Sequence, residues 1–405
     1  PAMVKDGYEG RYKPKSRESM GQYGKVDGCA TFWKRSKFEL VEDSSIEFNE
    51  CAVRAAQGMN LDDAEKRRFI SRLSKDNVAQ ILVLESLNSR AIVSAAQQAS
   101  MNRINNLTNS PTRAAPSEAS ISLSAAKIAV VNTHIYSNQS HPDVKLWQTW
   151  MLTQEVEHFC AMFQAKQVAL HASEPNAIQQ ELGLVICGDF NSEPSSAVYE
   201  LLKYGAVESN FPELEVGVGD GGLRGHGSMD NMYSGDNSGG SGYSHSYGGG
   251  GGKSKCRVLP DLENITHTME LGSVMDTAFG AEPDFTNYTI GYKGTLDYIF
   301  YTPNTIKVLA ASELPDEYSL MDISVGLPNV CFPSDHLMLC TEVSLAVNVI
   351  QTTVSSTPSA LATQLSQQHL STLLGISATP PPGVRPTTGL GAVSGAAAAN
   401  SRSVA

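Results

Sequence analysis

Residues 184–194 read Leu184-Val185-Ile186-Cys187-Gly188-Asp189-Phe190-Asn191-Ser192-Glu193-Pro194, an apolar run typical of a buried strand that ends in an acid and an amide. Residues two positions apart in a strand share one face, so Asp189 and Asn191 are expected to project together. Open α/β sheets collect their ligands at the carboxyl ends of their strands. A carboxylate can hold a hard cation or accept a proton from water, and an amide can donate to a phosphate oxygen. The pair therefore indicates metal-assisted phosphodiester hydrolysis.

Three further segments place acids or histidines at the ends of apolar runs: Asn132-Thr133-His134, Gly294-Thr295-Leu296-Asp297-Tyr298 and Phe332-Pro333-Ser334-Asp335-His336. Each motif alone is weak. A strand-end acid usually makes a surface ion pair worth about 0–1 kcal/mol, and the amide of Asn191 could simply form an Asx turn before Pro194. The occurrence of all four motifs in one chain favours a shared site over these structural alternatives.

These motifs resemble the endonuclease/exonuclease/phosphatase superfamily, and within it the carbon-catabolite-repressor-type deadenylases, which shorten the poly(A) tails of messenger RNA. Five more segments strengthen the resemblance to that branch: Tyr12 to Arg17, Val26 to Phe32, Lys75 to Asn77, Asp143 to Leu146, and Phe285 to Thr289. The resemblance implies an α/β, deoxyribonuclease-I-like fold, in which two mostly antiparallel sheets form a two-layer β-sandwich flanked by helices.

The resemblance also implies a magnesium-dependent site with two ions. Asp189 would activate or orient the attacking water and share a magnesium ion, and Asp335 would contribute to the metal site. Asn191 would donate to a nonbridging phosphate oxygen, and His134 would be a second phosphate contact. Hydrolysis of a phosphodiester needs an activated water, stabilisation of charge on the phosphoryl oxygens and help for the leaving oxygen.

Two further catalytic roles and the base contacts follow from the same resemblance. His336 would contact the phosphate, and Asp297 would hydrogen-bond His336 and favour its protonated form. Asn287 and Tyr292 match positions that contact the terminal adenine in the family. A base stacked on Tyr292 would contribute about 1–3 kcal/mol, although an ordinary half-buried sheet aromatic is the alternative. Gln139 stands where the family has a proline that sandwiches the adenine, which weakens the expectation of tight adenine selection.

The implied activity is 3′-to-5′ exoribonuclease action on poly(A), releasing 5′-AMP, with poly(A) RNA and a deadenylase scaffold complex as partners. A superfamily phosphatase or phosphodiesterase acting on a small phosphorylated substrate remains an alternative, as does a catalytically inactive scaffold module. Family members carry a strand with an asparagine and then a metal-binding glutamate upstream of the segment that Pro1 matches. Neither lies in this chain, so we expect an N-terminally incomplete domain that lacks its first strand and is weakly active or inactive. Either the sequence is a fragment or the native protein lacks one metal ligand.

The composition allows a sizeable folded core. Of the 405 residues, 41% are hydrophobic, and the formal net charge of -12 argues mildly against tight nonspecific binding of nucleic acid. The seven cysteines show no metal-type spacing, and no secretory signal is recognisable, which indicates a reducing compartment. No apolar run approaches the roughly 18 residues that span a bilayer. We therefore expect a soluble protein of the cytoplasm, the nucleus or both, with no membrane contact.

Residues 1–345 are expected to form one domain with two disordered inserts. Residues 88–124 are rich in Ser, Ala, Asn and Gln, and residues 217–255 are dominated by Gly and Ser. Such segments cannot bury enough apolar surface to offset their backbone entropy. Residues 346–405 have a similar composition and are expected to form a disordered tail.

Three local elements can also be predicted. Residues 26–42 favour a β-hairpin with a polar turn at 34–37. Asp143 is expected to cap a helix that runs to about Lys166. One face of that helix would be apolar, through Leu152, Val156, Phe159 and Phe163. A short helix is expected to begin near Ser195 or Ser196 and to end at Gly205.

Overall fold

A six-stranded mixed sheet forms the centre of the computed structural model, which describes residues 2–95, 98, 122–170, 177–208, 265–321, 326–345 and 349–351, apart from 19, 20, 22, 23, 25 and 124. The strands in spatial order are β3 (Phe38–Glu47), β4 (Val78–Ser86), β6 (Lys127–His134), β8 (Gly183–Asp189), β12 (Asp297–Tyr301) and β9 (Gly272–Ser273). Only β6 and β8 run parallel; the other neighbours in this sheet are antiparallel. The predicted α/β class is confirmed.

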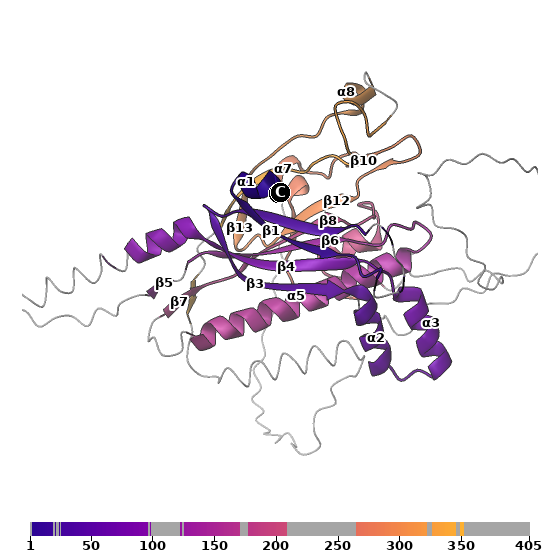
Figure 1. The fold of residues 1–405 in the computed structure, drawn as a ribbon, viewed down its shortest axis with the longest axis horizontal. Helices are drawn as coiled ribbons and strands as arrows, with labels where there is room; N and C mark the ends of the chain where they lie inside the picture. The colour runs from indigo at the N-terminus through magenta and orange to yellow at the C-terminus, as the bar shows by residue number, and fades with distance from the viewer. Residues whose placement is uncertain are drawn as a thin grey trace, which may run out of the picture.

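One face of the large sheet packs against helices (Figure 1). The helices whose buried side chains join the main core are α2 (Phe48–Gly58), α3 (Asp63–Leu73), α5 (Pro142–Leu170) and α6 (Ala197–Tyr204). The main core joins Ile81 and Val83 of β4 to Leu152 and Val156 of α5. The predicted apolar face of this long helix is therefore confirmed. The structure also contains the short helices α1 (Ala2–Lys5), α7 (Val274–Phe279) and α8 (Glu317–Met321).

The start of α5 corrects one prediction. The helix begins at Pro142, one residue before the expected cap, and proline is favoured at a first helical position because it has no N–H to satisfy. The buried carboxylate of Asp143 instead accepts two hydrogen bonds from Arg72 of α3, at 2.9 and 2.8 Å. The cap predicted at Asp143 is therefore wrong, because a residue distant in sequence occupies both of its oxygens.

The opposite face of the large sheet is covered by smaller sheets, which makes the fold a two-layer sandwich. They are β1 (Tyr8–Pro14) with β2 (Gly28–Lys34), and β13 (Ile306–Ala311) with β14 (Thr341–Leu345). A further two-stranded sheet pairs β10 (Asn287–Tyr288) with β11 (Lys293–Gly294). Leu82 and Leu84 point to this side and pack with Trp33 of β2. Because successive side chains of a strand alternate between faces, β4 supplies both cores and is buried from Val78 to Leu84.

The hairpin predicted over residues 26–42 is wrong in its pairing. Both strands exist, but β2 pairs with β1 and β3 pairs with β4. The polar turn at 34–37 therefore carries the chain from one layer of the sandwich to the other. A two-stranded hairpin and a crossover between layers have the same alternating pattern and the same turn residues, so local sequence does not distinguish them.

The predicted inserts and tail are only partly described. Residues 87–95 are helical, so the insert expected at 88–124 begins as a helix, and a further sheet contains β5 (Ser122–Leu123), β7 (Ala177–Gln180) and β15 (Val349–Gln351). The strand β15 lies beyond the domain boundary that we predicted at 345. The insert at 217–255 and the tail from 352 onward fall outside the described residues. No helix among the described residues is both long and apolar enough for a membrane span.

Gly188 lies one residue before Asp189, and its replacement is expected to destabilise the fold. Its φ is +151°, and a Cβ on Gly188 would lie 2.0 Å from the backbone oxygen of Thr133. We expect Gly188→Ala to lower the free energy of unfolding by about 1–3 kcal/mol or more, measured by urea denaturation. Gly291→Ala is the matched control, because no atom lies within 4 Å of the added methyl. Equal midpoints for the two variants would contradict this account.

Candidate active site

Three strand ends bring three of the predicted residues side by side. His134 ends β6 and lies opposite Asp189, the last residue of the parallel neighbour β8. Asp297 begins β12 and lies opposite Asp189 from the antiparallel side. Residues directly opposite on neighbouring strands have Cβ atoms about 4.5–5.5 Å apart. The sheet register alone therefore gathers a histidine and two carboxylates at one edge.

His336 reaches the same edge from a segment outside the large sheet. An isolated bridge pairs Asn287 with His336, and the backbone N–H of Leu337 donates to the oxygen of Thr286 at 2.7 Å. The ring Nδ1 of His336 then lies 2.7 Å from Oδ2 of Asp297. The contact predicted between these two side chains is thus present in the structure.

Asp189, Asp297 and His336 form a compact cluster. Each offers a ligand atom, and these atoms all lie within 4.8 Å of one another. Oδ2 of Asp189 lies 3.5 Å from Nε2 of His134 and 3.9 Å from Nε2 of His336. Asp335, the other predicted metal residue, is exposed and outside this cluster, with its Oδ2 3.5 Å from Nδ2 of Asn287. Its role as a ligand stays a prediction.

Asp189, His336 and His134 differ in protonation state because their surroundings shift their pKa values differently. Burial, and then the charge of Asp297, raise the pKa of Asp189 to about 7, against the opposing charge of His336. The hydrogen bond with Asp297 raises the pKa of His336 to about 9, against the effect of its burial. Burial lowers the pKa of His134 to about 4, and the charge of Lys15 acts in the same direction. At neutral pH the site therefore combines a cationic imidazole with a neutral one.

The amide of Asn191 is held in a strained turn beside Asp189. Its φ is +50°, a left-handed conformation that asparagine adopts more readily than most residues. Its backbone N–H donates to Oδ1 of Asp189 at 2.8 Å, and its Nδ2 donates to the oxygen of Ile135 at 2.9 Å. The structure thus places Asn191 next to the acid, with one amide hydrogen already used. Its contact with phosphate stays a prediction.

Two positioning residues were missed by the sequence reasoning. Thr286 donates from Oγ1 to Oδ2 of Asp297 at 2.6 Å and is fully buried. Lys145 donates from Nζ to the oxygen of Asn191 at 2.6 Å and to Oε1 of Gln139 at 2.7 Å. Both lie in segments that support the family resemblance, so a role for each could have been suspected from those segments.

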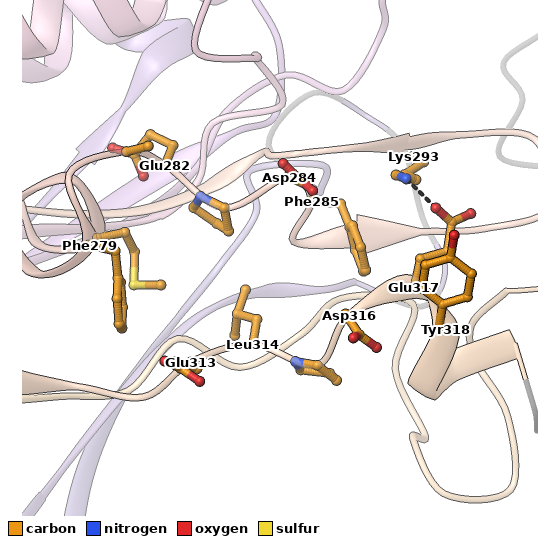
Figure 2. Close-up of a pocket in the computed structure, with 14 residues that line it drawn as sticks. Phe279, Glu282, Asp284, Phe285, Lys293, Glu313, Leu314, Asp316, Glu317 and Tyr318 are labelled. Carbon is orange, nitrogen blue, oxygen red and sulfur yellow. Dashed lines mark hydrogen bonds and ion pairs between the residues drawn. The ribbon is translucent and has the colours of Figure 1, made fainter.

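The predicted base contacts lie at the rim of the site. Asn287 is buried in β10, and Tyr292 lies in the turn before β11, where its Oη donates to Oε1 of Glu193 at 2.9 Å. A cavity of about 360 Å³ is lined by His134, Asp189 and Asp297, and neither Asn287 nor Tyr292 lines it. A larger cleft of about 510 Å³ lies against α7 and α8, and none of the predicted site residues lines it (Figure 2).

Comparison with known proteins agrees with this geometry. Residues 4–336 match the pattern of the Endonuclease/Exonuclease/phosphatase family. The chain belongs to this family. It is 32% identical over 354 residues to "Carbon catabolite repressor protein 4 homolog 1" of Arabidopsis thaliana, covering 84% of this chain and 46% of the relative. It is 31% identical over 350 residues to "CCR4-Not complex 3'-5'-exoribonuclease subunit Ccr4" of Mycosarcoma maydis, covering 84% and 40%.

Solved structures of the family show weaker likeness. The crystal structure of ANGEL2, a 2′,3′-cyclic phosphatase, in complex with adenosine-2′,3′-vanadate matches with 24% identity and a TM-score of 0.47, covering 85% of this chain and 76% of that chain. The human Nocturnin catalytic domain with bound sulfate matches with 17% identity and a TM-score of 0.40, covering 85% and 75%. This family member spans less than half the length of the two curated relatives described above.

The donor set fits a divalent cation. Two carboxylates face each other at Asp189 and Asp297, and burial makes the ionised form of Asp189 unfavourable when no cation is near. Carboxylate oxygens are the ligands that Mg²⁺ prefers. His336 is a poor ligand by comparison, because Asp297 occupies its Nδ1 and favours the protonated ring.

Magnesium is therefore expected to raise the melting temperature of this family member. A ligand that binds only the folded state stabilises it by about 2.7 kcal/mol at one hundred times its dissociation constant. The measurement is a thermal melt across a magnesium titration, with Asp189→Asn as the comparison. The shift should be much smaller in that variant, because one carboxylate is lost. Equal shifts in both proteins would place the ion elsewhere.

Proposed function

We propose that this protein is a magnesium-dependent 3′-to-5′ exoribonuclease that shortens poly(A) tails and releases 5′-AMP. The meeting of Asp189, Asp297 and His336 within 4.8 Å supports this proposal most directly, because it joins acids and an imidazole from distant segments in one place. The name of the Mycosarcoma maydis relative, a 3′-5′-exoribonuclease subunit of the CCR4-Not complex, supports the choice of RNA as substrate and of a deadenylase scaffold complex as partner. Cytoplasm, nucleus or both are the compartments that this function implies.

The chain's own residues would divide the chemistry among them. The carboxylate of Asp189 would orient the attacking water and accept its proton. The cationic ring of His336, held by Asp297, would stabilise the charge that develops on the phosphoryl oxygens. His134 is neutral and would donate one hydrogen bond to phosphate.

The cation and the amide would complete the site. Asp189 would hold magnesium together with Asp297, which faces it, and Asp335 remains the second residue predicted to contribute a ligand. When bound, magnesium would supply Lewis-acid stabilisation of the phosphoryl oxygens. Asn191 would give its remaining amide hydrogen to a nonbridging oxygen. Its position is fixed by Lys145 and by the carboxylate of Asp189. This arrangement would orient the amide before the substrate arrives.

A second candidate function is hydrolysis of a small phosphorylated molecule. Gln139 supports it, because Gln139 is tied to Lys145 of α5 by a 2.7 Å hydrogen bond and offers no rigid apolar ring for an adenine. A site with one stacking residue fewer binds the base of an RNA end less tightly.

The deciding experiment compares substrates on the purified chain. Labelled oligo(A), oligo(U) and small phosphomonoesters are incubated with magnesium or with a chelator, and the products are resolved by gel and chromatography. Stepwise shortening of oligo(A) from its 3′ end, with release of 5′-AMP only when magnesium is present, is the expected result. Equal rates on oligo(A) and oligo(U) would overturn the deadenylase assignment. Turnover of small phosphates alone would establish the second candidate, and no turnover at all would indicate an inactive scaffold module.

A further inference from the structure

The larger cleft, of about 510 Å³, lies apart from the candidate active site (Figure 2). Most of its lining comes from two walls, residues 279–285 after α7 and residues 313–318 leading into α8. None of the residues that we place in catalysis lines it. Ligand sites in proteins typically have volumes of about 300–1,000 Å³. The cleft is therefore large enough to hold several side chains of a bound molecule.

Apolar side chains of the packed interior form the floor of the cleft. Phe285 belongs to one core cluster and Met275 to another, and Leu314 packs against both. Two aromatic residues stand at the edges, Phe279 with 45% and Tyr318 with 80% of its surface exposed. Exposed apolar surface that is surrounded by polar residues marks interaction sites. The floor therefore offers apolar surface to a partner.

Contacts around the cleft hold its two walls in place. Lys293 forms an ion pair of 2.6 Å with Glu317, and its Nζ lies 5.3 Å from the centroid of the Phe285 ring. Asp316 accepts a hydrogen bond from the backbone N–H of Ser319 at 2.8 Å, at the start of α8. A surface that already has its binding shape loses less conformational entropy when a partner binds.

The lining of the cleft has an excess of acidic residues. They are Glu282, Asp284, Glu313, Asp316 and Glu317, against one basic residue, Lys293. Glu317 balances the charge of Lys293 through their ion pair. Burial raises the pKa of Glu282, whose Oε1 accepts a hydrogen bond from Oη of Tyr199 at 2.8 Å. The negative charge that faces solvent therefore comes from the other three acids.

These three exposed carboxylates lie on both walls, Asp284 on one, and Glu313 and Asp316 on the other (Figure 2). Within the described ranges, no salt bridge or side-chain hydrogen bond joins Asp284 or Glu313 to another residue. Their charges are therefore available to a ligand. Phosphate groups are repelled by carboxylates, whereas RNA binding relies on Lys and Arg. The cleft is thus unsuited to the backbone of an RNA.

We propose that the cleft docks a short basic segment of a partner protein, in which an apolar residue is flanked by arginines. The apolar side chain would cover Met275, Phe285 and Leu314, and its removal from water would favour binding. Each arginine would lay its methylene stem along apolar surface and reach a carboxylate with its guanidinium. Because Asp284 and Glu313 lie on opposite walls, one arginine would lie on each side of the apolar residue.

The apolar floor distinguishes this occupant from simpler cations. A polyamine or a metal ion would neutralise the carboxylates but would leave the floor in contact with water. Arginine is favoured over lysine because its planar guanidinium can form two parallel hydrogen bonds with a carboxylate and stack on an aromatic ring. Phe279 and Tyr318 offer such rings at the edges of the cleft.

The proposed docking site adjoins the segment that positions Asp297. Phe285 of the cleft is followed directly by Thr286, whose Oγ1 donates to Oδ2 of Asp297 at 2.6 Å. The cleft and the cavity that His134 and Asp189 line have no lining residue in common. A partner bound in the cleft would therefore lie close to the active site and leave its cavity open.

A phage library of random heptapeptides tests the proposal on the purified chain. Selection should enrich sequences that place arginine or lysine on both sides of a leucine, valine or aromatic residue. The most enriched peptide, carrying a fluorescent label, then gives a dissociation constant by anisotropy. That constant should rise with ionic strength, because salt screens exposed charges. Enrichment of no sequence, or of sequences without basic residues, would overturn the proposal.

Two matched double variants locate the bound peptide. Asp284→Asn combined with Glu313→Gln should raise the dissociation constant about tenfold, because hydrogen bonds to charged groups are lost. Asp43→Asn combined with Glu342→Gln removes the same charges from exposed positions of β3 and β14, and should leave the constant unchanged. Equal weakening in both variants would mean that only net charge matters, and no weakening in either would place the peptide elsewhere. Both of these results contradict docking in the cleft.

Tyr318→Ala and competition by spermidine test the apolar part of the proposal. Because Tyr318 is 80% exposed, the variant should keep its melting temperature. It should raise the dissociation constant of the peptide about two- to fivefold through loss of the aromatic edge. Spermidine should displace the peptide only at much higher concentration. Displacement at concentrations equal to those of the unlabelled peptide would show a polycation site and refute the peptide proposal.

This chain's own residues 253–260, Lys-Ser-Lys-Cys-Arg-Val-Leu-Pro, are a competing occupant, with three basic residues before an apolar pair. A synthetic peptide of that sequence is titrated against the chain and against Asp284→Asn combined with Glu313→Gln. If it binds more tightly than the selected peptide and weakens in the variant, the cleft belongs to the chain itself and the partner proposal fails. Weaker binding supports a partner. No RNA enters these measurements, so they hold whether or not the chain shortens oligo(A).

Discussion

Asp189→Asn is expected to abolish hydrolysis, lowering kcat by about 10³-fold or more relative to the unmodified chain. The substitution removes the negative charge and the proton acceptor that face His336 and Asp297. It keeps an oxygen that can accept the 2.8 Å hydrogen bond from the backbone N–H of Asn191, so the turn should be retained. The measurement is single-turnover cleavage of labelled oligo(A) with magnesium.

The same variant should be more stable than the unmodified chain when no metal is present. Folding raises the pKa of Asp189 from 3.8 to about 7, so the folded state favours the protonated carboxyl. Stability therefore falls as pH rises from about 4 through about 7, and it stays lower above that range. An asparagine cannot ionise and avoids this loss. A melt at pH 8 in chelator should show the higher melting temperature for Asp189→Asn. A lower one would mean that the substitution damages the fold, and the kinetic result would then say nothing about catalysis.

Features encoded within a few residues could be predicted from the sequence. The short helix α6 begins after Ser196, whose Oγ accepts from the backbone N–H of Tyr199 at 3.2 Å, and it ends at Gly205, whose φ is +79°. The end of the strand at Asp189 could also be predicted from local sequence, because the apolar run stops there. Both signals lie within one turn or one strand, and the folded structure retains them.

The layer to which a strand belongs could not be predicted. Residues 28–34 and 38–47 each have the expected strand character, yet they pair with different neighbours in different layers of the sandwich. Pairing is determined by which apolar faces meet in the folded chain, and Trp33 meets Leu82 and Leu84 of a distant strand. Local alternation carries no information about such a partner.

The sequence also did not show which side chains from distant segments would form hydrogen bonds with each other. Arg72 donates a hydrogen bond to the carboxylate of Asp143, and the phenol of Tyr292 donates one to Glu193. The motifs predicted that the acids and histidines lie in one site, because the family that they resemble has such residues in one site. They did not give the partner of Thr286, whose hydroxyl donates to Oδ2 of Asp297, although Thr286 lies in a segment that supports the resemblance.

His336→Gln and Asp297→Asn are each expected to lower kcat by about 10²-fold or more, with little change for the double variant beyond the larger single effect. Oδ2 of Asp297 lies 2.7 Å from Nδ1 of His336, and the pKa of the ring is raised to about 9 mainly by this contact. Without the negative charge the ring should titrate nearer its ordinary pKa of 6.5. NMR titration of the ring in the metal-free protein measures that change independently of activity.

Thr286→Val separates the charge of Asp297 from the position of its carboxylate. The hydroxyl donates to Oδ2 of Asp297 at 2.6 Å and accepts from the backbone N–H groups of Leu296 and Asp297 at 2.9 and 3.0 Å. Loss of this hydroxyl should lower the free energy of unfolding, because the buried N–H groups of Leu296 and Asp297 lose their acceptor. The raised pKa of His336 should be retained. A fall in activity with an unchanged ring pKa would show that the orientation of the carboxylate matters beyond its charge.

The double variant of His336→Gln and Asp297→Asn has an outcome that would contradict the paired role. If the losses in kcat of the two single variants multiply in the double variant, each residue acts on the substrate by itself, because a pair that works as one unit can be lost only once.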